Sequence, residues 1–396
     1  MKFLFISARL PMPDRASGDL RFFTLLEQFS AFGEVTLCPF LLEKQQQEIG
    51  KSESERYIET LSKAKIQIGH TNVLDTLRTT TFDFIFFEFY IGVKRYIDMV
   101  RFYQPDARVI VDSVDIHYKR ELAKAGLTKA KQDLIKAHET KQDELEAYQA
   151  SDAVICVTEE DQIELEKELA KTPKFIIPNI HHVPPYEKRN RPPRKLIFVG
   201  SFDHEPNIDA VVYFCEKIFP LLISQHAGLQ LDVIGPNPPP EVLAFQNESI
   251  RVHGRVPELA PYYISADISI APLRFGAGMK GKVGEAMSYG LPVVSTSFGA
   301  EGFGFENHKE IIVADDPAEF AQAVHLLIES PDKAAQIAEA GYQFIYERYS
   351  LEANQERLAV LKENLLKLKP QSLPFYKRLQ FSIKIKFDQH IRWRLK

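Results

Sequence analysis

Short, nearly continuous apolar runs recur along the chain and alternate with longer amphipathic or charged stretches. In the first half these runs are KFLFISA, EVTLCPF, IQIG, FDFIFFEFY, ARVIV, AVICV and FIIPN. Apolar runs without polar alternation are typical of parallel strands covered by helices on both faces. The stretches between them predict helices, notably over 20–32, within 41–64, and over a long charged stretch at 119–149. Repeated βα units of this kind predict an open parallel sheet.

The same alternation restarts after a Pro-rich, charged segment, HHVPPYEKRNRPPRK, which is the best linker in the sequence. Apolar runs then follow at KLIFVG, LQLDVIG, SIRVHG, ISIAPL, LPVVS and IIVAD. The intervening stretches predict helices over about 207–226, 257–265, 317–328 and 332–349. We therefore expect an α/β protein with two Rossmann-like domains, 1–185 and 186–350, whose parallel sheets face a central cleft.

The segment ISIAPLRFGAGMKGKVGEAMSYGLPVVSTSFGAEG, residues 268–302, combines a buried strand, a glycine-rich basic loop, a short helix and a second strand. Glycines let backbone N–H groups approach a ligand closely, and a helix N-terminus adds about half a positive charge. This layout favours anion binding, although a solvated turn in an ordinary α/β unit is the alternative. The loop glycines and cations are Gly276, Gly278, Gly281, Arg274, Lys280 and Lys282.

Two further features suit a sugar nucleotide better than a simple anion. Glu285 lies about one turn into the predicted helix, where its carboxylate can accept two hydroxyl hydrogen bonds from a ribose or a sugar. Phe275 and Met279 add apolar surface within the polar loop. Cations, a carboxylate and close backbone together favour a nucleotide diphosphate attached to a sugar.

This segment resembles the donor site of the retaining GT-B glycosyltransferases called family 4 or group 1. That family has two glutamates separated by seven residues and then G-x-P-V-V; EAMSYGLPVV keeps the second as Glu285, whereas Ala277 stands at the first. The resemblance implies phosphate contacts from Arg274, Lys280 and Lys282 and a ribose contact from Glu285. It also implies retention of anomeric configuration and a C-terminal segment, 351–396, that completes the first domain.

The loop GSFDHEPN opens the second domain's first helix, so Gly200 and Ser201 are expected to face the donor. The family's usual Arg and Lys after this strand are absent, and the basic loop is expected to neutralise the phosphates instead. Glu301, in GAEG, is our hypothesis for a residue that takes the sugar hydroxyls in place of the missing first glutamate.

In the first half, two loops carry the candidate acceptor-side residues. Gly18 and Arg21 lie in PMPDRASGDLR, for which a surface loop with a helix cap is the alternative interpretation. VDSVDIHYKRE follows a predicted strand, so Asp112, Asp115 and His117 are expected at the cleft; helix capping by Asp115 is the alternative. We expect mainly electrostatic catalysis by Arg274 and Lys280, with Asp115 and His117 as the candidates for proton transfer.

Composition narrows the setting of this chemistry. The 396 residues are 45% hydrophobic and 26% charged, as in ordinary globular proteins, and no apolar run is long enough to span a membrane. Three scattered cysteines in apolar segments indicate buried free thiols and a reducing, cytoplasmic compartment. The net charge is −5, yet residues 367–396 hold nine Lys or Arg and a single acid, Asp388. This tail favours contact with an anionic membrane surface, with a helix docked on the first domain as the alternative.

The expected function is therefore transfer of a sugar from a nucleotide-diphosphate sugar to a hydroxyl acceptor in polysaccharide, glycolipid or glycan assembly. The acceptor is a glycan or is lipid-linked; we expect no metal site, no cofactor beyond the donor substrate, and no nucleic-acid partner. A sugar-nucleotide epimerase or hydrolase of the same architecture is an alternative, and so is a catalytically weak donor-binding scaffold. A dehydrogenase is disfavoured because no G-x-G-x-x-G follows the first strand.

Overall fold

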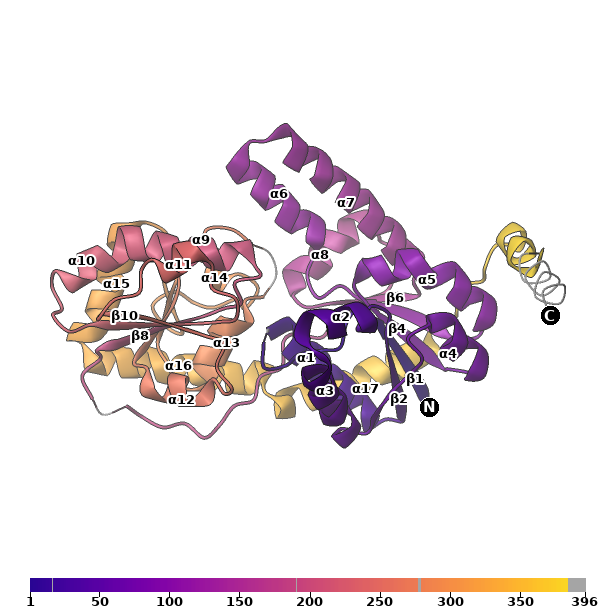
Figure 1. Ribbon diagram of the computed structural model, residues 1–396, viewed down its shortest axis with the longest axis horizontal. Coiled ribbons are helices and arrows are strands. Elements are labelled where there is room, and N and C mark those ends of the chain that lie inside the picture. Colours follow the sequence, from indigo (N-terminus) through magenta and orange to yellow (C-terminus); the bar gives the residue numbers. More distant parts are fainter. Residues whose placement is uncertain (16, 190, 277–278, 384–396) are drawn as a thin grey trace.

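Two parallel sheets, one in each half of the chain, organise the computed structural model (Figure 1). The structure describes residues 1–15, 17–189, 191–276 and 279–383. The first sheet has the order β3-β2-β1-β4-β5-β6-β7, and the second has the order β10-β9-β8-β11-β12-β13. Both orders begin on one side of the first strand and then cross to the other, which is the doubly wound Rossmann arrangement. The expected pair of Rossmann-like units is confirmed.

The strands coincide with the apolar runs. Those of the first sheet are β1 (Lys2–Ser7), β2 (Glu34–Pro39), β3 (Ile66–Ile68), β4 (Phe84–Glu88), β5 (Arg108–Asp112), β6 (Ala153–Cys156) and β7 (Lys174–Ile176). Those of the second are β8 (Lys195–Val199), β9 (Gln230–Ile234), β10 (Ile250–Gly254), β11 (Ile268–Ala271), β12 (Val293–Ser295) and β13 (Ile312–Val313).

Helices cover both faces of each sheet. In the first half they are α1 (Ser17–Ser30), α2 (Leu42–Ile49), α3 (Lys51–Lys63), α4 (Val73–Thr79), α5 (Phe89–Tyr103), α6 (His117–Thr128), α7 (Lys131–Gln149) and α8 (Glu159–Glu168). In the second half they are α9 (Glu205–Tyr213), the π-helix η1 (Phe214–Ile218), α10 (Phe219–Ile223), α11 (Pro240–Leu243), α12 (Ala260–Ser265), α13 (Gly281–Ser288), α14 (Ser297–Ala300), α15 (Pro317–Glu329), α16 (Pro331–Tyr349) and α17 (Leu351–Lys367).

Aromatic rings fill one face of the first sheet. Phe5 in β1 and Phe86 in β4 are register partners, and their rings stack with centroids 4.6 Å apart. Phe29 of α1 meets both rings edge-on, at 5.5 and 4.8 Å. These contacts fix α1 across β1 and β4, which are the two strands at the topological switch point.

The charged stretch at 119–149 folds as a helical hairpin rather than as one helix. α6 ends at Thr128, the next residue Lys129 adopts a left-handed conformation with φ of 55°, and α7 returns antiparallel beside α6. Figure 1 shows this hairpin projecting from the first domain above the boundary with the second. The predicted helix at 207–226 is likewise divided, into α9, the π-helical turn η1 and α10.

The helix that follows the second domain, α17, returns to the first domain. Leu358, Leu361 and Leu365 of α17 are buried in the same core cluster as the strands β1, β2 and β4. The Pro-rich linker is also held in place, because Arg189 donates hydrogen bonds to the carbonyl oxygens of Ala266, Tyr263 and Tyr289. The linker therefore follows the surface of the second domain.

Two predictions made from the composition concern the cysteines and membrane-spanning helices. The three thiols of Cys38, Cys156 and Cys215 are free and buried. Among the described residues, no helix is long and apolar enough to cross a membrane.

Shortening one leucine side chain of α17 tests whether this helix packs in the core of the first domain. Leu361→Ala should lower the free energy of unfolding by roughly 2–5 kcal/mol, because it leaves a cavity where the side chain is 2% exposed. Val360→Ala on the same helix is the matched control, because Val360 is 50% exposed. Urea unfolding followed by circular dichroism measures both. Equal stability of the two variants would contradict the packing of α17 in this core.

Candidate functional site

The candidate site lies where two loops leave the second sheet beside its switch point. β8 and β11 are neighbouring strands, and their carboxyl ends lead into the loops at 200–204 and 272–280. The second loop continues directly into α13, whose N-terminus begins at Gly281. Ligands of doubly wound sheets bind at this position. The topology thus brings Gly200, Ser201 and the basic loop to one edge, as expected.

Lys282 is the central cation of this edge. Its ammonium group donates a hydrogen bond to the side-chain oxygen of Asn207 and lies 4.6 Å from the centre of the Phe198 ring. Loss of water around the ammonium, together with repulsion from Lys280, lowers the pKa of Lys282 to about 7. No carboxylate of the described residues lies within ion-pair distance of this lysine.

Asn207 and Gly200 hold Lys282 in place. The amide nitrogen of Asn207 donates to the carbonyl oxygen of Ser201 at 2.6 Å, which ties α9 to the loop after β8. A Cβ atom at Gly200 would lie 2.8 Å from the ammonium nitrogen of Lys282, so a side chain here would displace Lys282 or Asn207. Asn207 is thus a residue of the candidate site that the sequence analysis did not predict.

Lys280 and Glu301 form the second polar pair of the edge. Their charged groups are 3.3 Å apart, and the side chain of Lys280 is 10% exposed. Burial lowers the pKa of Lys280, and the carboxylate of Glu301 partly opposes this shift. Glu301 therefore lies beside the basic loop, as our hypothesis requires. Gly276 has a positive φ of 144°, a conformation that favours glycine, whereas Ala277 and Gly278 lie outside the described residues.

Glu285 lies one turn into α13 and contacts a buried tyrosine. The hydroxyl of Tyr263 donates to its carboxylate at 3.2 Å, and Tyr263 stacks on Tyr289. Loss of water raises the pKa of Glu285 to about 7, although the hydrogen bond from Tyr263 opposes the shift. The carboxyl group is thus oriented by a fixed donor and keeps acceptor capacity for a ligand hydroxyl.

Arg274 is held apart from the two lysines, at the rim of the site. Its Nε donates to the carboxylate of Asp209 at 2.9 Å, and its guanidinium lies 4.6 Å from the ring centre of Tyr213. It borders a cavity of about 250 Å³ between the hairpin and the second domain. The lining residues are Lys124, Thr128, Glu205, Asp209, Arg274 and Phe275.

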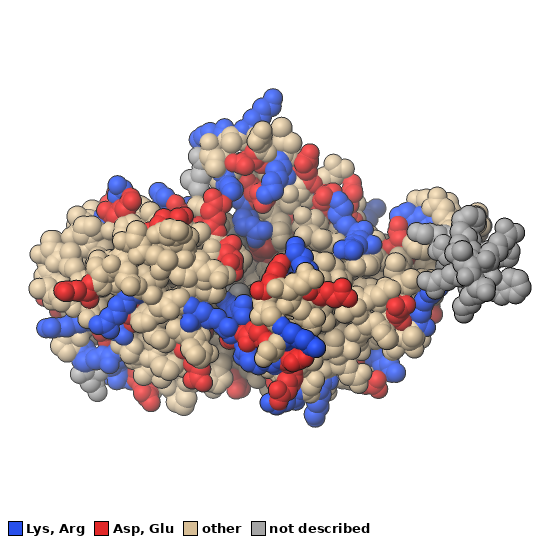
Figure 2. All heavy atoms as spheres, in the orientation of Figure 1, with Lys and Arg blue, Asp and Glu red and all other residues tan. Residues whose placement is uncertain are grey.

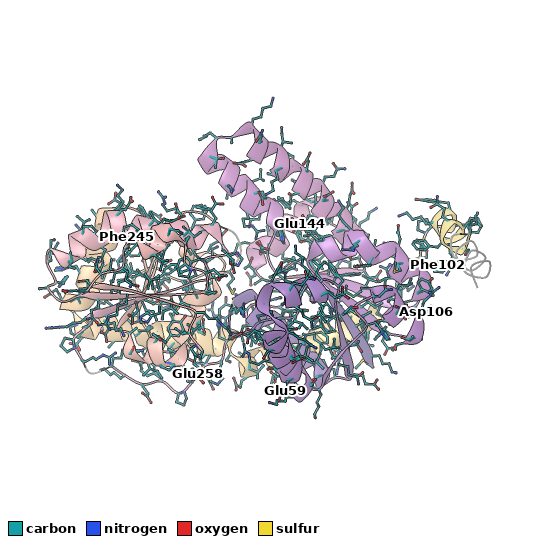
Figure 3. All side chains as sticks on the ribbon, viewed as in Figure 1. Glu59, Phe102, Asp106, Glu144, Phe245 and Glu258 are labelled. Carbon is teal, nitrogen blue, oxygen red and sulfur yellow. The ribbon has the colours of Figure 1, made fainter. Side chains whose placement is uncertain are left out.

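Across the boundary, a polar cluster occupies the start of α6. Nδ1 of His117 lies 3.5 Å from carboxylate oxygens of both Asp115 and Glu144, and Asp115 pairs with Arg120. The carboxylate of Glu144, labelled at the base of the hairpin in Figure 3, also accepts hydrogen bonds from the backbone N–H groups of His117 and Tyr118. Glu144 caps this helix, a role that its position in a charged stretch did not reveal.

The remaining acceptor-side candidates lie deeper. Arg21 and Asp112 form an ion pair at 2.6 Å with side chains 1% and 5% exposed, so the pair joins α1 to the end of β5. Beside them, burial and the carboxylates of Asp19 and Asp112 raise the pKa of Glu88. Gly18, in the first turn of α1, has open space where a side chain would begin. The structure therefore gives Arg21 and Asp112 a positioning role in the conformation described.

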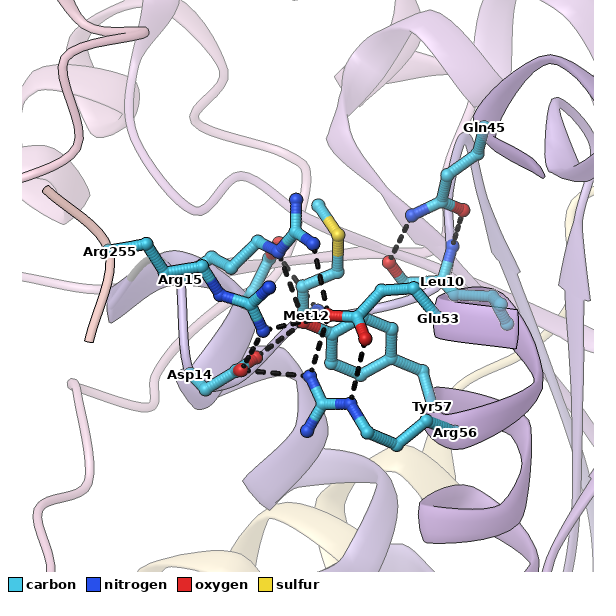
Figure 4. A network of polar contacts seen from close by, with 10 residues as sticks. Leu10, Met12, Asp14, Arg15, Gln45, Glu53, Arg56, Tyr57 and Arg255 are labelled. Carbon is cyan, nitrogen blue, oxygen red and sulfur yellow. Dashed lines mark hydrogen bonds and ion pairs between the residues drawn. The ribbon is translucent and has the colours of Figure 1, made fainter. Parts of the chain in front are cut away.

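Charged residues also connect the two domains. Arg255, after β10, donates to Asp14 at 2.7 Å and pairs with Glu53 at 2.7 Å, while Arg56 and Tyr57 complete the network (Figure 4). Lys124 of the hairpin pairs with Glu205 of the second domain at 2.7 Å. Figure 2 shows Lys and Arg side chains gathered along this boundary, below the hairpin. The contacts of Arg255 and of Lys124 each link segments far apart in sequence, so no local signal identified them.

Part of the chain is similar in sequence to a known protein family. Residues 193–330 match the family model of the glycosyl transferases group 1. An uncharacterized 44.6 kDa protein in the cps region of Klebsiella pneumoniae is 26% identical over 189 residues, which are 45% of this chain and 48% of that protein. The chain thus aligns with about half the length of this curated relative.

Solved structures share this fold. HepE of Anabaena, solved in complex with UDP, has a TM-score of 0.69 at 12% identity over 92% of this chain and 100% of its own. A variant of S. aureus TarM, solved with fondaparinux, alpha-GlcNAc-glycerol and UDP, has a TM-score of 0.58 at 15% identity over 72% of this chain and 55% of its own. The fold is GT-B.

The lowered pKa of Lys282 predicts a pH-dependent effect on stability. An unfolded lysine stays protonated to a pH of about 10.5, whereas the folded one loses its proton near the pKa of about 7. Because the unfolded state binds more protons between these values, this site makes folding more favourable as the pH rises through that window. Lys282→Met should therefore be more stable than the wild type near pH 7, with the difference shrinking toward about pH 9.

Urea unfolding of both proteins at several pH values measures this difference. Lys217→Met, which removes a lysine that is 61% exposed, is the control and should show little change with pH. A difference between Lys282→Met and wild type that stays constant across the window would contradict the lowered pKa.

Proposed function

We propose that this chain transfers a sugar from a nucleotide-diphosphate sugar to a hydroxyl acceptor in polysaccharide, glycolipid or glycan assembly, with retention of anomeric configuration. A single observation carries the proposal: Lys282 and Lys280 lie side by side at a switch-point edge, one turn before the carboxyl group of Glu285. HepE has been solved with UDP and with UDP-glucose, so a uridine donor is our first choice. The cps-region relative supports polysaccharide assembly.

The proposed donor orientation follows from the polar groups of the site. The diphosphate lies against Lys282, Lys280 and the N-terminus of α13, where cations and helix amides favour an anion. The ribose hydroxyls donate to Glu285, which Tyr263 already orients. Glu301 pairs with Lys280. In the proposed orientation its carboxylate therefore lies beside the phosphates, in the part of the site proposed for the sugar.

During transfer, the bond from the anomeric carbon to the diphosphate oxygen breaks, and the electron pair leaves with the phosphate. Positive groups that are already fixed stabilise this charge without reorganisation, which is the largest contribution in many enzymes. The acceptor oxygen bonds to the same carbon, and its proton passes to a base. His117, set between Asp115 and Glu144, is the proposed proton acceptor. The lysines supply the positive charge, so the proposed reaction is metal-independent.

Nucleotide-sugar binding and turnover test this proposal. UDP-glucose, GDP-mannose and ADP-glucose are screened by thermal shift, because a ligand that binds the folded state raises its melting temperature. Lys282→Met should lose roughly 10- to 100-fold in affinity for the ligand that binds, as expected when a charged hydrogen bond is removed. The same variant should be no less stable than wild type without ligand, which separates a lost contact from a damaged fold. Glu285→Gln should weaken binding less than Lys282→Met does.

Three outcomes distinguish the candidate activities. Release of nucleotide that depends on an added glycan or lipid-linked acceptor supports the transferase. Release or isomerisation of the donor without an acceptor supports the epimerase or hydrolase alternative, and binding without turnover supports the scaffold alternative. Unchanged affinity in Lys282→Met, with Lys217→Met as the surface control, would contradict the proposed donor site.

We further propose that the C-terminal tail contacts an anionic membrane surface on the cytoplasmic side. Residues 375–383 form a helix that exposes apolar side chains, with Phe375 81%, Leu379 50% and Ile383 58% exposed. The helix contacts the first domain through Lys377, which pairs with Asp98, and through the ring of Phe381, which stacks on that of Phe102 (Figure 3). Residues 384–396, outside the described part, contain five more Lys or Arg and one acid.

Vesicle flotation tests the tail. The full chain should float with vesicles that contain phosphatidylglycerol and remain unbound with neutral phosphatidylcholine vesicles, since cations near an anionic surface contribute about 1 kcal/mol each. Phe375→Ser combined with Leu379→Ser should reduce flotation several-fold. Leu243→Ser, at an apolar position that is 46% exposed in the other domain, is the control. Equal flotation by all three proteins would contradict membrane contact through this helix.

A further inference from the structure

A cluster of three metal-ligating side chains occupies the outer end of the second domain. His325 and Glu329 lie on α15, and His226 lies in the turn between α10 and β9. One possible ligand atom from each lies within 4.8 Å of the other two. In Figure 1, α10 and α15 lie at the end of the domain opposite the first domain. The cluster is therefore separate from the candidate donor site.

Two levels of structure bring these side chains together. His325 and Glu329 are four residues apart on a helix, so their side chains project from the same face. α10 and α15 contribute Phe219, Leu222 and Leu327 to one core cluster, which fixes the two segments against each other. The backbone N–H of His226 donates to the carbonyl oxygen of Leu222 at 2.9 Å, so the turn places its imidazole over α15.

The distances within the cluster are short. Nε2 of His226 and Nδ1 of His325 are 2.8 Å apart, which requires one imidazole to donate and the other to accept. Nδ1 of His226 lies 3.6 Å from a carboxylate oxygen of Glu329. The side chain of His226 is 11% exposed, whereas that of Glu329 is 60% exposed. The cluster is thus built on a nearly buried histidine and opens to solvent on the carboxylate side.

We propose that His226, His325 and Glu329 bind one divalent transition-metal cation of the Zn²⁺ class. Two imidazoles and one carboxylate form a ligand set that zinc accepts in tetrahedral geometry, with water in the fourth position. Ligand atoms at zinc distances of about 2.0–2.1 Å are roughly 3.3 Å apart, so Nε2 of His226 and Nδ1 of His325 need to move only slightly apart. The exposed carboxylate of Glu329 would turn from Nδ1 of His226 toward the same ion. Nitrogen ligands favour zinc over Mg²⁺, which prefers oxygen.

The end of α15 supplies an independent electrostatic argument. Glu329 is the last residue of this helix, and the last turn contains no basic residue. A carboxylate at the negative end of a helix dipole is unfavourable, whereas a cation there is favourable. A bound metal ion would neutralise both and join α15 to the turn before β9. Because none of these residues belongs to the candidate donor site, the ion would have a structural role.

Zinc titration of the full chain, purified without a histidine tag, tests the site. Isothermal titration with ZnCl₂ should show one high-affinity ion per chain, and MgCl₂ should show none. His325→Gln and Glu329→Gln should each weaken this binding at least about tenfold, as expected when one of three ligands is lost. His138→Gln, at an exposed histidine on the hairpin, is the matched control and should bind like wild type.

Two further measurements keep the result independent of folding and of the donor site. Co²⁺ in place of zinc should give the intense visible absorption of a tetrahedral site in wild type and not in His325→Gln. Zinc should raise the melting temperature of wild type but not of His325→Gln. Absence of a stoichiometric site, or zinc binding that both ligand variants retain, would overturn the proposal. Affinity for nucleotide sugars should be the same in all these variants, so failure of either proposal leaves the other testable.

Discussion

A half-buried lysine that has no carboxylate partner among the described residues is the constraint on which the rest of the site depends. Lys282 has the amide oxygen of Asn207, the ring of Phe198 and the nearby cation Lys280 as its neighbours. Arg21 and Arg101, the buried arginines of the first domain, have carboxylate partners at 2.6 and 2.8 Å. Because an unpaired cation is costly to remove from water, the arrangement around Lys282 supports the proposal that an anion completes the site. The glycine at position 200 and the start of α13 are required by the same geometry.

The two domains meet through contacts that are weak one at a time. Arg255 with Asp14 and Glu53, and Lys124 with Glu205, join the domains on different segments, and all five side chains are partly exposed. Pairs of this kind contribute little each and are screened by salt. By contrast, α17 buries leucines in the first domain's core, so the covalent return of the chain is firmly anchored. The domains are therefore joined firmly by α17 and only weakly by these partly exposed ion pairs.

The sequence was sufficient for elements whose signal is local. Every strand coincides with an apolar run, and the basic loop fell at the switch-point edge because parallel sheets place such loops there. The hairpin was not predicted, because the left-handed residue that follows α6 is Lys129 rather than a glycine, and Gly126 lies within the helix. Arg189 was assigned to a linker, although it is bound to four backbone carbonyls of the second domain. The sequence analysis selected Arg21 and Asp112 as acceptor-side candidates. It could not predict that the two side chains are buried against each other, because that depends on tertiary packing.

The three cations of the basic loop lie in two different environments. Lys280 and Lys282 lie inside the edge, where loss of water lowers the pKa of each. Arg274 is bound by Asp209 at the rim and lines the cavity that the hairpin closes through Lys124. In the proposed donor orientation the two lysines contact the diphosphate, and Arg274 could reach a phosphate only through the guanidinium N–H groups that Asp209 leaves unused. The rim cavity would then hold the part of the substrate beyond the diphosphate, since carboxylates, the cations of Lys124 and Arg274 and the ring of Phe275 line it.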